Sequence, residues 1–262
     1  MTSNKEPKRR LMWRWTEKRL NTQRSFNRWD ALKLFALGLM LLDHIGHFFF
    51  ADIEWLRAIG RSAPMVFLFL VGYAPHYRFQ RELLWLAVLL TISDFMLLMT
   101  PNELNILFTI LLCRAALNWQ ERQSKIIKRP LEWYLISMLL MLPTMFVVMY
   151  GSLVFPFALL GYMMRRREHY PPHELWMIGI LAVASYGAVQ ASLFDFSIEG
   201  VAVMVGGLCL TMLAICLSSK TMLQAVRLAP WLELPAQLAA RYTAHLYVLH
   251  LIVMQWMTYK QI

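Results

Sequence analysis

Apolar residues occur in long runs along almost the whole chain, and short polar segments separate the runs. The runs cover approximately residues 32–50, 63–77, 83–100, 104–117, 131–149, 152–164, 174–193, 198–218 and 242–258. Pro101 and Pro130 stand between runs, whereas Pro64, Pro143 and Pro156 fall inside runs or at their ends. Because a helix needs about 20 mainly apolar residues to cross a bilayer, the pattern predicts an all-α, polytopic integral membrane protein. We expect about nine transmembrane helices, within a range of about eight to ten.

Lysine and arginine are distributed unevenly over the segments between the runs. With the N-terminus in the cytoplasm, 23 of the 26 basic side chains fall on the cytoplasmic side. They are ten in residues 5–33, two in 78–81, five in 114–129, three in 165–167 and three in 220–241. The other side keeps Arg57, Arg61 and Lys260. Since cytoplasmic loops of membrane proteins retain positive charge, this asymmetry predicts a cytoplasmic N-terminus.

The composition agrees with a chain that lies almost entirely in the lipid bilayer. Hydrophobic residues make up 58% of the 262 residues and charged residues 16%, against about 45–50% and 25% in soluble proteins. We expect a basic cytoplasmic extension at residues 1–30 and a single transmembrane domain at 31–262, with no room for a separate soluble catalytic domain. The net charge of +10 then reflects topology and anionic lipid headgroups, and nucleic acid is not expected as a partner.

Two segments differ from the apolar runs. The first 28 residues lack a short apolar region that ends in a cleavage site, so they do not resemble a removable signal peptide. Residues 219–241 form the longest predicted loop, in which AVRLAPWLEL is either an amphipathic segment on the inner membrane surface or a plain connector. The three cysteines lie in apolar runs without metal-ligand spacing, and no metal is predicted.

Ionisable residues inside a membrane are costly, so each is a candidate for function. The first run has Lys33 at its cytoplasmic mouth and Asp43, His44 and His47 towards its outer half. Eleven positions separate Lys33 from His44, which is about 16 Å along a helix. An imidazole can take and return a proton near neutral pH. We therefore interpret His44 as a candidate base and Lys33 as a candidate contact for the other end of a long ligand.

Further polar residues enter the other runs. Arg57 and Arg61 lie on the predicted outer side, where they either bind an acidic group, neutralise Asp43 or anchor a helix at the interface. The remaining candidates are Asp94, Asn105, Tyr150, His245, Tyr247 and His250. A histidine or carboxylate of this kind can also be satisfied by hydrogen bonds between helices, without any role in chemistry.

Five short segments, taken in order, resemble the TraX family, membrane proteins of conjugative plasmids that acetylate the N-terminus of pilin. The segments are LKLFALGLMLLDHIGH from Leu32, IGRSAPMVFLF at 59–69, NILFT at 105–109, MYGS at 149–152 and YTAHL at 242–246. The family is similar in turn to a wider group of transmembrane acyltransferases, whose first helix carries a basic residue and a histidine separated by ten residues. Lys33 and His44 have that spacing. Lysine replaces the commoner arginine here, so it would meet a phosphate as a point charge without a bidentate fork.

The resemblance implies an acetyltransferase in the bacterial inner membrane that uses acetyl-CoA as donor and pilin as acceptor. It implies His44 as the catalytic histidine with Asp43 beside it, and binding roles for Lys33, Arg61, Asn105 and His245. The phosphates of CoA are expected near Lys33 and the thioester near His44. Arg61 or Asn105 is expected to donate to the tetrahedral oxyanion, whereas His47 and His250 fall outside the family pattern.

Several alternatives stay open at this stage. The acceptor could be a saccharide hydroxyl, and His44 could act as a general base or carry the acetyl group itself. A non-enzymatic transporter or pilus assembly factor would use buried His and Asp side chains to relay protons. The chain shows no inverted repeat of the kind that many transporters have. The oligomeric state does not follow from the sequence.

Overall fold

A computed structural model describes residues 26–98, 104–123, 126–194, 196–218 and 224–259. These residues form helices and connecting turns, without a β-strand; two isolated β-bridges join Asn27 to Ala225 and Leu104 to Val148. The predicted cytoplasmic extension lies, up to residue 25, outside the described residues, as do Pro101 and Lys260. The expectation of an all-helical protein is confirmed for the described part of the chain.

Every apolar run of the sequence falls on one or more helices. The longer helices are α2 (Arg28–Phe48), α5 (Arg81–Leu98), α6 (Ile106–Gln123), α10 (Pro172–Leu193), α11 (Ile198–Ser218) and α13 (Thr243–Tyr259). The shorter ones are α3 (Glu54–Gly60), α4 (Ala63–Tyr73), α7 (Pro130–Leu139), α8 (Met141–Met145), α9 (Phe155–Arg165) and α12 (Pro230–Arg241). Two 3-10 turns, η1 (Gly151–Val154) and η2 (Arg167–His169), flank α9.

Four helical segments are long and apolar enough to cross a membrane. They are α2, the consecutive pair α3 and α4 (Glu54–Tyr73), α10, and α11 from Ile198 to Leu217. The expected count of nine spans is not confirmed. α7 has 10 residues and α9 has 11, or about 15 and 16 Å of helix, against a hydrocarbon core of about 30 Å. The run at 131–149 is divided between α7, which ends at Leu139, and the five-residue α8. Pro143 lies within α8, and a proline inside a helix removes a backbone hydrogen bond and breaks or kinks the helix.

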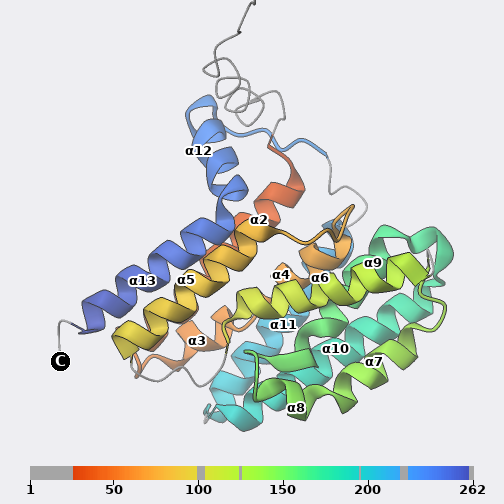
Figure 1. Ribbon diagram of the computed structural model, residues 1–262, viewed down its shortest axis with the longest axis horizontal. Helices are drawn as coiled ribbons and strands as arrows, with labels where there is room; N and C mark the ends of the chain where they lie inside the picture. Colours follow the sequence, from red (N-terminus) through yellow and green to blue (C-terminus); the bar gives the residue numbers. More distant parts are fainter. Residues whose placement is uncertain (1–25, 99–103, 124–125, 195, 219–223, 260–262) are drawn as a thin grey trace, which may run out of the picture.

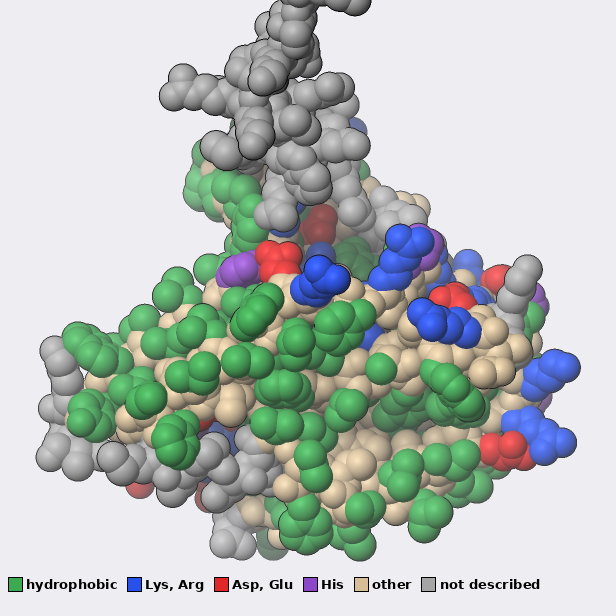
Figure 2. Space-filling view, viewed as in Figure 1, with side chains coloured by type: hydrophobic (Ala, Val, Ile, Leu, Met, Phe, Trp, Pro, Cys, Tyr) green, Lys and Arg blue, Asp and Glu red, His purple; other side chains and the backbone are tan. Residues whose placement is uncertain are grey.

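Large apolar side chains cover much of the outer surface of the bundle. On α5 they are Trp85, Leu89, Ile92, Phe95 and Met96, and on α13 they are Leu249, Val253, Trp256 and Met257. Figure 2 shows hydrophobic side chains spread over the broad face, whereas Lys, Arg, Asp and Glu gather along its upper and right-hand edges. An apolar surface of this extent is typical of contact with lipid rather than water. Together with the four candidate spans, it indicates a membrane protein.

The central helix of the bundle is α4, which packs along α9 (Figure 1). Gly72 makes this close approach, because a Cβ at this position would overlap the backbone of Ala158 on α9. Small residues commonly let membrane helices approach in this way. On the other side of the molecule, α13 lies beside α5, and both α13 and α3 contact α2. α2 thus joins α13 to α3.

The predicted loop at 219–241 is wrong for its second half, where α12 forms. Pro230 occupies the first turn of this helix, a position at which proline needs no hydrogen-bond donor and is common. α12 projects from the bundle in Figure 1 and contacts α2 and α13, while Trp231, Leu232 and Leu234 on it are exposed. Only the second half of AVRLAPWLEL, from Pro230, belongs to this helix, and its position on the membrane surface stays a prediction.

Candidate active site

Asp43 and Arg61 form a buried ion pair where α2 and α3 come closest. A Cβ at Gly60 would overlap the Cβ and backbone of Asp43, so glycine is required for this approach. Immediately after α3, Arg61 Nη2 lies 3.5 Å from Asp43 Oδ1, and the two side chains are 6% and 12% exposed. The pair neutralises two charges that would each be costly alone inside a membrane. Of the three interpretations that the sequence left open for Arg61, the structure thus agrees with the neutralisation of Asp43.

Arg61 also holds two tyrosines from distant parts of the chain. Its Nη1 donates a hydrogen bond to the Tyr150 hydroxyl at 3.1 Å, and Tyr186 donates to the Arg61 carbonyl at 3.0 Å. Tyr150 is the non-glycine residue with positive φ (65°) in the described part of the chain. The backbone bond from Met149 N–H to the Leu104 carbonyl, 2.7 Å long, holds the segment before it. Such strained conformations often occur at functional sites.

His44 and His250 contact each other between α2 and α13. His44 Nδ1 lies 2.8 Å from His250 Nε2, and His250 Nδ1 lies 2.9 Å from the Leu246 carbonyl oxygen one turn earlier. The ring of Tyr247 is within 6.0 Å of the His44 ring, measured between centroids. His44 Nδ1 thus contacts a neighbouring imidazole, while the Asp43 carboxylate is paired with Arg61.

A small cavity lies beside His44. Its volume is about 10 Å³, close to what one water molecule needs. The lining residues are Met40, Asp43, His44, Gly60, Ala63, Pro64, Ile106, Met149, Tyr150 and Tyr247. The cavity therefore has room for one small reacting group between the candidate base and the Tyr150 side chain.

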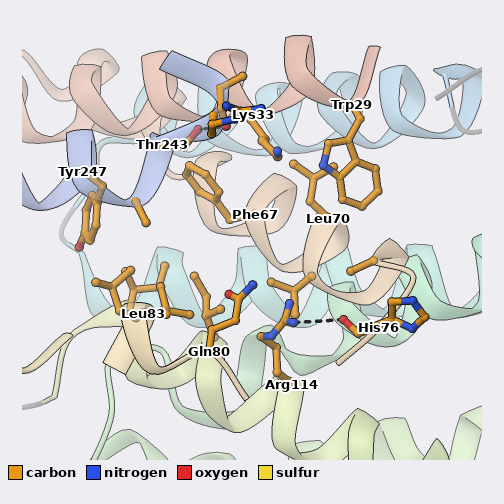
Figure 3. A pocket seen from close by; sticks show the side chains of 18 of the residues that line it. Trp29, Lys33, Phe67, Leu70, His76, Gln80, Leu83, Arg114, Thr243 and Tyr247 are labelled. Atoms are coloured by element: carbon orange, nitrogen blue, oxygen red, sulfur yellow. Dashed lines mark hydrogen bonds between the residues drawn. The ribbon is translucent and has the colours of Figure 1, made fainter. Parts of the chain in front are cut away.

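A much larger cavity of about 510 Å³ adjoins the small one. The two share the lining residues Met40, Ile106 and Tyr247. In Figure 3, Tyr247 lies at one end of the large cavity and Trp29 and His76 at the other, with Lys33 and Arg114 on opposite walls. Its basic lining residues are Lys33, Arg78, Arg114 and Arg241, and none of the described lining residues is acidic. The cavity can therefore admit a long ligand with an anionic end and an apolar arm.

Hydrogen bonds fix the segment between α4 and α5 that forms the rim of the large cavity. Arg114 donates to the carbonyls of His76 and Arg78, each at 3.1 Å. The Tyr77 hydroxyl donates to the Gly72 carbonyl at 2.5 Å and receives a bond from Arg166 at 3.4 Å. Burial raises the pKa of Tyr77 above its usual value, although the Arg166 guanidinium beside it acts in the opposite direction. Tyr77 therefore stays a neutral hydrogen-bond donor at neutral pH.

The other residues that the sequence singled out lie at three different places in the structure. Lys33 lines the large cavity, with Nζ 3.5 Å from Asp30 Oδ1. The Asn105 amide group donates to the Ala87 carbonyl and Thr91 hydroxyl, so it joins α6 to α5. His245 is half-exposed, with Nε2 3.3 Å from Glu82 Oε1. His245 lines a neighbouring cavity of about 590 Å³ at the same end of the molecule and does not line the cavity at His44.

Asp94 belongs to a second polar contact, between α5 and α13. Its Oδ1 accepts a bond of 2.5 Å from Gln255 Nε2, and Ser93 donates to Gln255 Oε1 at 3.1 Å. Gln255 is buried. This contact satisfies the polar groups of two helices and does not include His44. Asp94 therefore makes a hydrogen bond between two helices, which is the kind of contact that the sequence left open for a carboxylate inside an apolar run.

Sequence reasoning gave too little weight to three residues of this site. His250 contacts His44 although it falls outside the family pattern, Arg114 binds the rim of the large cavity although the sequence indicates only a cytoplasmic charge, and no sequence pattern indicates Tyr186. One signal was present for His250. His245 and His250 are five residues apart, so on a helix they face in directions about 140° apart, and only one of them can point at α2.

Comparison with known proteins identifies the family. The sequence model described as TraX protein matches residues 28–257. A curated, uncharacterized protein of Rickettsia prowazekii is 33% identical over 90 residues, which cover 34% of this chain and only 36% of that protein. No solved structure matches the chain significantly. Because the family match extends from the start of α2 almost to the end of α13, this membrane protein belongs to the TraX family.

Proposed function

We propose that this protein is an acetyltransferase of the bacterial inner membrane. It moves an acetyl group from acetyl-CoA, which enters at the cytoplasmic face, to the N-terminal amine of mature pilin at the periplasmic side. Membership in the TraX family, which is associated with pilin modification, supports the reaction class. The observation that carries the proposal is the large basic cavity that shares three lining residues with the small cavity at His44.

The length and charge distribution of acetyl-CoA support its assignment to the large cavity. This donor has phosphates at one end and a thioester at the tip of a long flexible arm. Lys33, Arg78, Arg114 and Arg241 supply positive charge at the cavity, and guanidinium groups suit phosphate oxygens. Apolar residues such as Phe67 line the space that leads to Tyr247. Since Lys33 and His44 are about 16 Å apart along α2, we expect the arm to bring the thioester to His44.

The chemistry then follows from the groups around the small cavity. The amine attacks the thioester carbonyl carbon while His44 accepts a proton from the amine. The tetrahedral intermediate carries its negative charge on oxygen, and the Tyr150 hydroxyl, which receives a hydrogen bond from Arg61, donates to that oxygen. Collapse of the intermediate breaks the carbon–sulfur bond, and the departing thiolate takes the proton from His44. A transient acetyl-His44 is the covalent alternative.

Acetyl transfer can be tested with the full-length protein in lipid nanodiscs. We would add acetyl-CoA and a peptide with the N-terminal sequence of mature pilin, and follow thiol release and peptide mass. The control acceptors are the same peptide with a blocked N-terminus and a saccharide of comparable size. We expect acetylation of the free peptide amine alone. Acetylation of the saccharide would replace the acceptor in this proposal, and donor binding without any transfer, or no donor binding, would overturn it.

Narrowing the large cavity should weaken binding of the donor. Val71 on α4 lines this cavity, and tryptophan in its place would occupy part of the space for the pantetheine arm. An unfavourable fit of about 1–3 kcal/mol corresponds to roughly a 5-fold to 150-fold higher KM for acetyl-CoA. The matched control is Val253→Trp on the exposed face of α13. Equal KM values for the two variants would contradict the assignment of this cavity to the donor.

Removing the Tyr150 hydroxyl should slow the chemical step without weakening donor binding. In Tyr150→Phe the ring stays in place, but the group that donates to the oxyanion is lost. Loss of one such donor typically lowers kcat about 10²-fold or more, and KM for acetyl-CoA should change little. Tyr186→Phe is the comparison for an indirect effect, because Tyr186 donates to the Arg61 backbone and shares a hydrogen bond with Tyr150, but does not line the small cavity. A larger effect at Tyr186 than at Tyr150 would exclude the hydroxyl of Tyr150 as the donor.

A further inference from the structure

The contact between His44 and His250 determines which nitrogen of His44 carries a proton. The chain of contacts begins at the Leu246 carbonyl oxygen, which can only accept a hydrogen bond. His250 Nδ1, 2.9 Å away, must therefore be the donor and carry the proton. In a neutral imidazole the other nitrogen then has a free lone pair, so His250 Nε2 is an acceptor.

The acceptor nitrogen of His250 in turn determines the tautomer of His44. His44 Nδ1 lies 2.8 Å from His250 Nε2, and because that nitrogen accepts, His44 Nδ1 donates. The lone pair of neutral His44 is then on Nε2. The backbone of α13 thus fixes the tautomer of a histidine on α2 through one intervening ring.

We propose that His250 is a positioning residue that holds His44 in the tautomer with a free Nε2 and fixes the plane of its ring. The role of His44 as the base rests on the proposed function, whereas its tautomer rests on the contacts alone. Catalytic histidines elsewhere are commonly oriented by a carboxylate. Here the neighbouring carboxylate of Asp43 lies against Arg61, and a neutral imidazole takes that place.

A neutral positioning partner suits this location. When His44 accepts a proton at Nε2, its Nδ1–H becomes a charged donor, and the hydrogen bond to His250 becomes stronger. His250 therefore stabilises the cationic intermediate without adding a second permanent charge to the membrane interior. The half-buried His250 ring also packs against Tyr247, at 5.6 Å between centroids, which limits its rotation.

The test compares three substitutions of His250 that differ in what they offer to His44. In His250→Gln the amide oxygen can reach the place of Nε2 and accept from His44 Nδ1–H. In His250→Asn the side chain is one carbon shorter and reaches only towards Leu246, and His250→Leu offers no acceptor. Leu249→Ala, a change on the exposed side of the same helix, controls for general damage to α13. Thermal midpoints of all variants in nanodiscs show whether each one folds.

Kinetics should separate the three substitutions. We expect kcat to fall about 10-fold to 100-fold in the Leu and Asn variants, as for other residues that orient a functional histidine, with KM for acetyl-CoA unchanged. The Gln variant should recover most of the lost kcat. Equal activity of the Gln, Asn and Leu variants, or a loss that appears in KM alone, would overturn the positioning role.

A spectroscopic measurement tests the tautomer separately from the proposed function. Nitrogen-15 NMR of the labelled protein in lipid should show His44 protonated at Nδ1 in the wild type and a mixture of tautomers in His250→Leu. Assignment comes from the signal that is lost in His44→Gln. If the wild type transfers no acetyl group, the proposed function fails while this spectrum still decides the tautomer. A wild-type His44 protonated at Nε2 would overturn the inference even in an active enzyme.

Discussion

Replacing His44 by alanine is expected to lower acetyl transfer by about 10²–10⁴-fold, the usual contribution of a positioned general base. The reason is that no other described side chain at the small cavity can take the proton of the attacking amine. Asp43 is bound to Arg61, and Tyr150 receives a hydrogen bond from Arg61. Initial rates of thiol release and peptide mass measure the loss, and the KM for acetyl-CoA should stay close to that of the wild type.

His173 provides the matched control for this substitution. It lies at the exposed start of α10, far along the chain from the site, and His173→Ala should transfer acetyl groups at the wild-type rate. If His44→Ala also retained the wild-type rate, the base would have to be sought elsewhere. Mass analysis of the wild type, incubated with acetyl-CoA but no peptide, adds a further distinction. An acetyl group on His44 would support the covalent route, and its absence the general-base route.

The helical architecture could be predicted from the sequence because lipid imposes a simple pattern. Each apolar run became helix, since backbone groups inside a bilayer must be satisfied within their own segment. The number of spans did not follow, because the runs at 131–149 and 152–164 form the short helices α7, α8 and α9. Hydropathy alone does not tell a full span from a shorter helix that packs against neighbours.

The candidate site could be predicted only where it lies on one helix. Lys33 and His44 share α2, so their separation follows from helix geometry, and they line two neighbouring cavities that share three residues. The contact between His44 and His250 joins residues 206 positions apart. No local pattern contains the packing of α13 on α2, so a histidine at 250 looked like any other polar residue in an apolar run.

The same limit explains the assignment of Asn105. At the mouth of a helix its amide looked available for an oxyanion, but the packing of α6 against α5 directs both described donor bonds to Ala87 and Thr91. For Tyr150 the structure gives the reverse result. The sequence left Tyr150 a candidate without an assigned role, whereas the turn with positive φ brings its side chain to the small cavity.

Arg61→Met should cause the largest loss of stability among single substitutions at this site. The change leaves the Asp43 carboxylate buried without its counter-ion, and breaking a buried pair from one side typically costs about 3–5 kcal/mol. The hydrogen bond from Arg61 to Tyr150 is lost as well, which adds about 1 kcal/mol. We expect a strongly lowered thermal midpoint in nanodiscs and a lower yield of folded protein.

The double variant Asp43→Leu with Arg61→Met separates the effect of the ion pair on stability from the effect of side-chain packing. It removes both members of the pair and leaves apolar groups of similar size between α2 and α3, and such replacements are often neutral or stabilising. Its thermal midpoint should therefore lie well above that of Arg61→Met, with a remaining deficit of about 1 kcal/mol from the lost hydrogen bond between Arg61 and Tyr150. If the double variant were as unstable as the single one, the loss would come from the shape of the Arg61 side chain. The ion pair would then contribute less to stability than the packing of Arg61 against Phe194. The Phe194 ring centroid lies 4.0 Å from the Arg61 guanidinium carbon.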